Sequence, residues 1–273
     1  IRLIQVIQGA GALTMVFNAT ALWQQEARDP QRYLRETGEP RRFRDAWAVF
    51  ARNGRAVRFL VATALGTAAF TMQDVLLEPY GGEILGLSVG ATTGLTAILA
   101  GGTLVAFGLG AGALRGGADP LRLAAMGALV GLPAFAAVIF AAPMDVPVMF
   151  AAGAGLIGLG GGLFGVGTLT AAMAMESGGL TGLALGAWGA AQATAAGTAV
   201  ALGGVLRDVV NGFAASGMLG STLVTPATGY TLVYQLEIIL LFAALVAIGP
   251  LVGTIRRETP ATSAAFGLAE FPG

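Results

Sequence analysis

The feature that most constrains this chain is a series of long apolar runs. About 20 consecutive apolar residues are enough for a helix to cross a bilayer, and we find seven such runs. They lie at 1–22, 56–78, 88–114, 121–141, 148–174, 180–206 and 231–254. The chain is 55% hydrophobic and only 11% charged, which would leave a soluble domain with too much exposed apolar surface. We therefore predict an all-α integral membrane protein with seven transmembrane helices.

The one long hydrophilic segment, 23–55, joins the first two runs. Nine of the 15 basic residues, all of them arginine, lie in or beside it. Because cytoplasmic loops carry the excess of Lys and Arg, we place this segment in the cytoplasm. Phe43, Trp47 and Phe50 fall on one face of a helix there. That helix either lies along the membrane surface or packs on the bundle.

The order of segments matches the second part of a twelve-helix transporter fold, in which a long cytoplasmic loop joins two six-helix halves. The last helix of the N-terminal half would be 1–22, followed by the cytoplasmic loop 23–55. The C-terminal half would be 56–255, followed by a cytoplasmic tail at 256–273. The chain begins inside an apolar run without Met, so we expect it to be part of a longer protein. The connection 112–122 resembles the Gly/Arg/Asp loop of the major facilitator superfamily.

A polar motif closes the second apolar run. It reads Gln73, Asp74, Val75, Leu76, Leu77, Glu78, Pro79, Tyr80, Gly81, Gly82. Ionisable groups near lipid are costly unless paired or hydrated, so they mark a functional site or a membrane-interface boundary. Asp74 and Glu78 are four residues apart and would share one face of a helix. In the structural alternative, Pro79 ends the helix, Tyr80 anchors it at the interface and the two glycines turn the chain.

Four further residues are secondary candidates. Trp188 and Gln192 share a face of the sixth run at mid-membrane, where a buried amide usually makes an interhelical hydrogen bond. Tyr234 and Glu237 lie near the start of the last run, where an interfacial position is the alternative to a functional one.

Glycine recurs at four-residue spacing in two runs. Gly158, Gly161, Gly162 and Gly165 form overlapping pairs in the fifth, and Gly178, Gly182 and Gly186 open the sixth. Such spacing lets helix backbones approach closely.

Several function classes lose support. The chain has no cysteine and no histidine, which removes thiolate ligands, the usual axial ligand of tetrapyrroles and any His-based triad. No nucleophile–base pair or metal cluster emerges, so we predict that the protein is not an enzyme. The formal net charge is +0, which gives no argument for nucleic acid.

Long stretches resemble the bacteriochlorophyll delivery family, the PucC/LhaA-like branch of the major facilitator superfamily. The similarity runs from Ala69 to Gly82, then through Leu85–Val89 and Thr92–Thr103. The segments Arg2–Gly9 and Trp23–Pro30 are similar to the family as well.

The resemblance implies an assembly factor of light-harvesting complexes that binds bacteriochlorophyll and delivers it to antenna polypeptides. It would work in the inner, intracytoplasmic photosynthetic membrane of a bacterium, among membrane lipids, with the reaction-centre complex or bacteriochlorophyll synthase as further partners. The residues carried over are Gln73, Asp74, Glu78, Pro79, Tyr80, Gly81 and Gly82. Without histidine, the axial ligand of the pigment's Mg²⁺ would be an oxygen, with Glu78 or Asp74 as candidates.

Two alternatives stay open. One is a proton-coupled secondary transporter of a small solute that uses Asp74, Glu78 or Glu237 as proton sites. The other is a scaffold subunit that stays in a photosynthetic complex without moving pigment.

Overall fold

The computed structural model describes residues 9, 11–17, 19–20, 43–175 and 181–253. The chain divides into two units, 1–42 and 43–273, and each is described by itself. The described residues of the first unit are helical. The predicted span 1–22 therefore lies mostly outside the described residues, as do loop residues 23–42, Gly178 and the tail 256–273.

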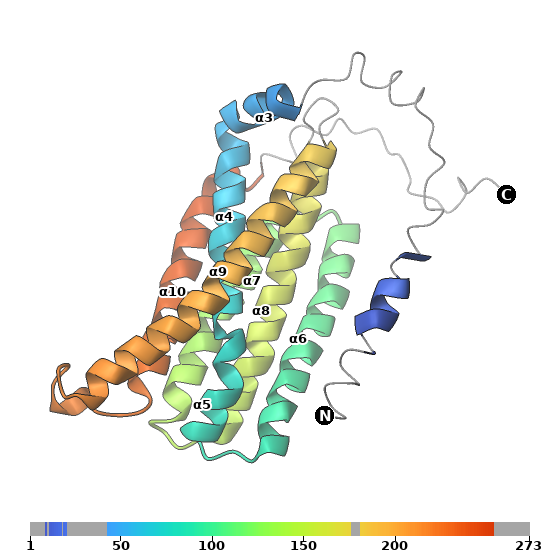
Figure 1. Cartoon of the computed structure of the whole chain (residues 1–273). Coiled ribbons are helices and arrows are strands. Elements are labelled where there is room, and N and C mark those ends of the chain that lie inside the picture. Colours follow the sequence, from blue (N-terminus) through green and yellow to red (C-terminus); the bar gives the residue numbers. More distant parts are fainter. Residues whose placement is uncertain (1–8, 10, 18, 21–42, 176–180, 254–273) are drawn as a thin grey trace. The chain divides into compact units, whose positions relative to one another are not determined.

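The second unit is built from helices (Figure 1). They are α3 (Phe43–Arg52), α4 (Gly54–Thr71), η1 (Met72–Val75), α5 (Leu77–Glu83), α6 (Val89–Arg115), α7 (Pro120–Ala141), α8 (Pro147–Ala174), α9 (Thr181–Ala215), η2 (Ser221–Leu223), α10 (Thr228–Ile248) and η3 (Gly249–Leu251). Within the described residues, six helical stretches are long and apolar enough to cross a membrane, the first of them running from Gly54 through α5 to Glu83. The chain thus has the helices of a multi-pass membrane protein.

Local signals explain where these helices begin. Asn53, Ser88 and Asp119 precede α4, α6 and α7, and each side chain accepts a hydrogen bond from a backbone N–H in the first turn. Such caps satisfy donors that the helix itself leaves unpaired. Pro120 and Pro147 occupy the first positions of α7 and α8, where a missing N–H does no harm.

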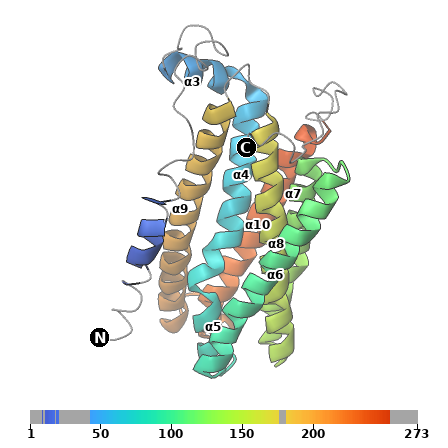
Figure 2. The ribbon, with the colours of Figure 1, turned by 90° about the vertical axis from the view of Figure 1, so that its right-hand side faces the viewer.

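The α7–α8 pair forms the centre of the bundle. α6 packs on α8, α10 packs on α7 and α4, and α9 packs on α4 and α10. Figure 1 shows α9 crossing the bundle obliquely, and in Figure 2 α9 lies to one side of α4 and α6 to the other. We call the two ends of the bundle after the short helices that lie there. The α3 end holds the start of α4 and of α7, and the α5 end holds the start of α6 and of α10.

Close helix contacts depend on several glycines of α8. The spacing predicts this correctly for Gly158 and Gly162, but a Cβ atom on Gly161 would have nothing closer than 3.4 Å, and one on Gly165 nothing within 4 Å. A Cβ atom on Gly158 would lie 1.9 Å from the backbone oxygen of Leu99 on α6. On the other side of α8, a Cβ on Gly160 would lie 2.7 Å from the backbone oxygen of Gly127 on α7. Both distances are too short for a carbon atom, so only glycine lets these three backbones approach so closely.

The glycines at the start of α9 behave differently. Nothing lies within 4 Å of a Cβ built on Gly182 or Gly186, so the predicted close packing through this pair does not occur among the described residues. Most glycines of α6 are equally open, including Gly90, Gly94 and Gly108. The open stripes on α6 and α9 are therefore free of contact within this bundle.

The amphipathic segment forms α3 and packs on the bundle through Phe50. This ring is 3% exposed and clusters with Ala56, Ala184 and Ala187. Trp47 stacks on it at a centroid distance of 5.9 Å and stays 40% exposed. Of the two interpretations of this helix, packing on the bundle accounts for the position of Phe50.

Two polar contacts close the α3 end of the bundle. The Arg58 guanidinium donates to the carbonyls of Ala247 (2.9 Å) and Val246 (3.0 Å), which have no partner further along α10. Asp119, which caps α7, also accepts a hydrogen bond from the backbone N–H of Gly253. The start of α4 and the start of α7 are thereby fixed to the end of α10.

Two predicted boundaries differ from the structure. The first described span continues to Glu83 instead of ending at residue 78. α9 continues to Ala215, although residues 207–230 were predicted to form a connection. The apolar run stops at Arg207, but this side chain finds partners on neighbouring helices and the backbone stays helical for more than two further turns.

Candidate functional site at the break in the first span

The predicted polar motif lies at an interruption of the first described span. α4 ends at Thr71, a 3-10 turn covers Met72–Val75, and α5 restarts the helix at Leu77. Pro79 explains the break, because it has no N–H to donate to Val75 and its ring clashes with that carbonyl. The Leu76 N–H instead bonds to the carbonyl of Gln73 at 2.8 Å, and regular bonding resumes from Tyr80 to Leu76 at 2.9 Å.

Gln73 and Asp74 lie within the 3-10 turn. The Gln73 side chain is 1% exposed, and its amide nitrogen donates to the Asp74 carboxylate at 2.6 Å and to the Phe70 carbonyl at 3.4 Å. Both partners are acceptors, which fixes the orientation of the amide. Its oxygen therefore points the other way, where it is buried without a hydrogen-bond partner. Asp74 lies on the exposed side of the turn.

Glu78 belongs to α5, beyond the break. Its carboxylate accepts a hydrogen bond from the Thr96 hydroxyl of α6 at 2.6 Å, and both side chains are exposed. Asp74 lies in η1 and Glu78 in α5, so the break separates the two carboxylates that were predicted to share one face of a helix. Both nevertheless lie on the exposed surface of the chain.

Tyr80 is buried, at 1% exposure, and does not anchor the helix at the membrane interface as the structural alternative expects. Its ring lies 5.3 Å from that of Phe150, 5.2 Å from Tyr230 and 5.6 Å from Tyr234. A Cβ atom on the next residue, Gly81, would meet side chains including Phe150 at 3.2 Å. These aromatic contacts fix α5 against α8 and α10.

Gly82 makes no comparable contact, because nothing lies within 4 Å of a Cβ atom built on it. The turn that leads to α6 comes later, where Gly86 has a φ of 62°. The two adjacent glycines therefore do different things, and Gly82 continues α5 instead of turning the chain.

Glu237 is fully buried on α10, at 0% exposure, so its side chain lies inside the bundle. Neither of its carboxyl oxygens has a hydrogen-bond partner among the described residues. α10 packs on η1, which brings the Asp74 carboxylate and the backbone N–H of Gln73 near this carboxyl group. Tyr234, one turn earlier and equally buried, also has an unpartnered hydroxyl. The structure thus brings Glu237, a secondary candidate from the sequence, to the break that carries Gln73 and Asp74.

The other two secondary candidates do not join this group by any hydrogen bond. Trp188 is half-buried, and its indole N–H is buried without a partner in the described part of the chain. Gln192 is also half-buried, and the interhelical hydrogen bond expected of it is not among the contacts of the described residues.

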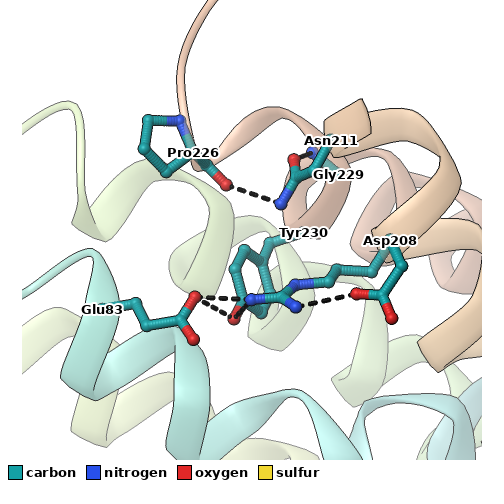
Figure 3. A network of polar contacts seen from close by, with 7 residues as sticks. Glu83, Asp208, Asn211, Pro226, Gly229 and Tyr230 are labelled. Carbon is teal, nitrogen blue, oxygen red and sulfur yellow. Dashed lines mark hydrogen bonds and ion pairs between the residues drawn. The ribbon is translucent and has the colours of Figure 1, made fainter. Parts of the chain in front are cut away.

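A second polar network lies at the α5 end and was not predicted (Figure 3). The Arg207 guanidinium of α9 pairs with Glu83 of α5 and with Asp208, at 2.8 Å from the latter. Arg207 also bonds to the hydroxyl of Tyr230, which donates to Glu83 at 2.7 Å. One turn further along α9, Asn211 accepts from the backbone N–H of Gly229 at 2.7 Å and donates to the Pro226 carbonyl at 3.1 Å.

This network joins three helices through side chains that the sequence placed in connections. One signal was available: Arg207 is the only arginine between residue 122 and residue 256, and an isolated cation beside apolar runs needs a partner. Its partner, Glu83, could not be identified because the two lie 124 positions apart.

The described residues contain no group of three or more acidic side chains that could hold a metal ion. Oxygen donors occur here as separate carboxylates, on Asp74 and Glu78. Each carboxylate could donate one oxygen to a metal ion whose other ligands belong to a bound molecule, as in the case of Mg²⁺ in a tetrapyrrole.

Among the described residues, six apolar helical stretches, with carboxyl groups at a break in the first and inside the last, define the class as a multi-pass membrane protein. A family model described as "PUCC protein" matches residues 1–255. The chain belongs to the PucC family.

Three curated relatives are informative. The chain is 52% identical, over 100% of its length and 57% of the relative's, to an uncharacterized protein of the puhA-bchM intergenic region of Rhodobacter capsulatus. It is 53% identical to Protein PucC of Rhodovulum sulfidophilum, over 77% of this chain and 46% of that protein. It is 30% identical to the bacteriochlorophyll synthase 44.5 kDa chain of Rhodobacter capsulatus, over 81% of this chain and 50% of the relative.

These relatives come from photosynthetic bacteria and are linked to photosynthesis gene clusters. The chain spans about half the length of the curated relatives it matches.

Proposed function

We propose that this protein assists the assembly of light-harvesting complexes by binding bacteriochlorophyll and delivering it to antenna polypeptides. Membership of the PucC family is the observation that carries the proposal. The name of one relative, a bacteriochlorophyll synthase chain, supports a connection with this pigment. The reaction-centre complex and bacteriochlorophyll synthase are further partners under this proposal.

The exposed carboxylates at the break are the proposed contact with the pigment. Asp74 and Glu78 are exposed on a bundle whose surface is otherwise largely apolar. One oxygen of Glu78 is bound by Thr96, which orients the carboxylate and leaves the other oxygen for a ligand. Open glycines of α6, such as Gly90 and Gly94, would leave room for a flat ring against this helix, which also carries Thr96. The bound pigment would supply a Mg²⁺ centre with a free axial position, and oxygen ligands suit that ion.

The arrangement of the helices supports the wider architecture proposed for the protein. Six spans arranged as in the second unit suit the C-terminal half of a twelve-helix fold of the major facilitator type. The described arginines at the start of α4, the end of α6 and the start of α7 gather at the α3 end. We therefore infer that this end faces the cytoplasm and that the protein lies in the inner, photosynthetic membrane.

An absorption spectrum of the full-length protein, purified in mild detergent away from antenna subunits, tests the proposal. We expect bound bacteriochlorophyll that falls several-fold in Glu78→Gln and in Asp74→Asn. Asp145→Asn is the matched control, because Asp145 is an exposed carboxylate in the loop before α8. Its φ of 53° is one that Asn also tolerates. Pigment-free protein, or equal loss in all three variants, would contradict the proposed site.

A second function is favoured by one observation. Broken membrane helices with polar groups at the break form the substrate and ion sites of secondary transporters, and α4 breaks at Gln73 and Asp74 beside the buried Glu237. A proton-coupled transporter of a small solute would carry no pigment and would acidify or alkalise proteoliposomes when solute is added. A scaffold subunit would co-purify with antenna complexes but exchange no pigment.

A further inference from the structure

The buried carboxyl of Glu237 has no cation to neutralise it. α8 carries no charged residue, and α7 carries only Arg122 in its first turn. α9 carries Arg207 and Asp208, which pair with each other, and Arg207 also pairs with Glu83. α4 carries Arg55 and Arg58, of which Arg58 binds the far end of α10. Among the described residues, no basic side chain bonds to Glu237.

The groups that do surround Glu237 are acidic or neutral. Asp74 from η1 is its charged neighbour. Tyr234 lies one turn away on α10, and Tyr80 of α5 and Tyr230 lie next to that ring. An isolated carboxylate in such surroundings loses its hydration without gaining a cation, and repulsion from a second carboxylate adds to this cost. The bundle therefore accommodates Glu237 far more readily as the neutral acid.

The orientation of Gln73 fits a protonated Glu237. Its amide nitrogen is held by Asp74 and Phe70, which leaves the amide oxygen buried and without a partner. This oxygen can only accept a hydrogen bond, and the described residues around it provide none. A carboxylic acid on Glu237 would supply the missing donor, while an ionised Asp74 keeps the donor it already has.

We propose that Glu237, Gln73 and Asp74 form a proton-binding site at the break between α4 and α5. Glu237 holds the proton, Gln73 accepts a hydrogen bond from that acid through its amide oxygen, and Asp74 is the ionised partner on the exposed side. Two carboxyl groups, one buried and one exposed, flank a single glutamine at the point where the helix is interrupted.

Infrared spectroscopy of the full-length protein in lipid nanodiscs tests this site directly. At neutral pH we expect the carbonyl band of a protonated carboxyl group, shifted by D2O and by ¹³C-labelling of glutamate. Glu237→Gln should remove that band. Gln73→Leu should keep it but move it to higher frequency, because the acid then loses its hydrogen-bond partner. Asp145→Asn, the same change at an exposed loop carboxylate, should leave it unchanged.

Two results would overturn the proposal. A protonated carboxyl band that survives Glu237→Gln places the proton elsewhere, and a band that does not shift in Gln73→Leu removes the glutamine from the site. If Glu237→Gln fails to fold, the labelled band in Gln73→Leu still decides the question. The outcome does not depend on pigment, so the proton site and the proposed function can fail separately.

Discussion

α8 and α9 carry similar four-residue glycine spacings and use them differently. Along α8, Gly158 and Gly160 lie against the backbones of α6 and α7. Along α9, a Cβ atom on Gly182 or Gly186 would have nothing within 4 Å. Among the described residues, a glycine of α9 approaches a neighbour closely only at Gly203, against Met72 of η1. α8 is therefore held by backbone contact with both α6 and α7. α9 is held mainly by side chains, including Ala184 and Ala187 against Phe50 and the polar network at its far end.

This difference shows that spacing alone does not tell which glycines are in a helix contact. The spacing permits close approach, but a neighbouring helix must be present on that face. For α8 the neighbours are α6 and α7 in the same bundle. The open faces of α6 and α9 have no such neighbour among the described residues, so lipid or other protein segments must cover them in the membrane.

The most direct test of the difference between α8 and α9 is to place the same large side chain on both helices. Gly158→Leu should abolish a folded, monodisperse protein, because the new Cβ would lie 1.9 Å from a backbone oxygen that cannot move aside. Overpacking commonly costs about 1–3 kcal/mol and more where backbones must separate. Gly186→Leu should leave folding intact. Size-exclusion profiles and thermal unfolding of the full-length variants measure both.

If Gly186→Leu is as damaging as Gly158→Leu, the open face of α9 is packed in the full-length protein. That outcome would contradict the distinction between the two helices and identify the covered face. The distinction stands if only the α8 variant fails.

Two adjacent glycines of α9 allow a packed position and an open position to be compared within one helix. A Cβ on Gly203 would lie 2.7 Å from the Met72 side chain and 2.8 Å from its backbone oxygen, whereas Gly204 has nothing within 4 Å. Gly203→Ala should destabilise the protein by about 1–3 kcal/mol, and it should also displace η1. Gly204→Ala should be neutral or slightly stabilising, because alanine favours a helix. Thermal unfolding of both variants is the measurement, and equal effects would contradict the packing of α9 on the break.

Sequence reasoning located the spans well, and the reason is physical. Each apolar run must cross the bilayer as a helix, so six predicted spans appear within a few residues at most of their ends. The exceptions are the ends near Glu83 and Arg207, where polar side chains satisfy one another across helices. Pairing of this kind depends on tertiary contact, which apolar run length does not encode.

The candidate site was predictable in part. Gln73, Asp74 and Glu78 could be singled out because polar groups beside lipid are unusual, and Pro79 gave a reason for a helix to stop. That the chain continues as a second helix, with Tyr80 buried among aromatic rings, depends on α8 and α10 being adjacent. The proximity of Glu237 to Asp74, 163 positions earlier (237 − 74), required the structure.

A substitution of Asn211 on α9 tests how much the side chains of this helix stabilise the start of α10. Asn211 acts as a cap supplied from another helix, since it accepts the backbone N–H of Gly229 at 2.7 Å. Asn211→Ala should cost roughly 1 kcal/mol, as loss of a capping side chain usually does. Asn211→Asp keeps the acceptor and serves as the control in thermal unfolding. If both variants are equally unstable, the bond to Pro226 rather than the cap is what matters.

The ion pair between Arg207 and Glu83 should have the smallest effect on stability. Their side chains are 24% and 54% exposed, and pairs this open to solvent contribute roughly 0.2–1 kcal/mol. Arg207→Gln and Glu83→Gln should each lower the unfolding temperature slightly, and the double variant should add little beyond either one because both changes remove the same contact. Asp208→Asn, which leaves the link between α9 and α5 in place, is the control.

High salt should weaken the effect of Arg207→Gln, since screening reduces the value of an exposed pair. If the two substitutions lower the unfolding temperature additively, the helices are not coupled through this contact. A loss of stability much larger than expected would show that the ion pair is shielded from water in the full-length protein. In that case the far end of α9 would be held as firmly as α8 is by its glycines, and the contrast between the two helices would apply only to the part of α9 before Gly203.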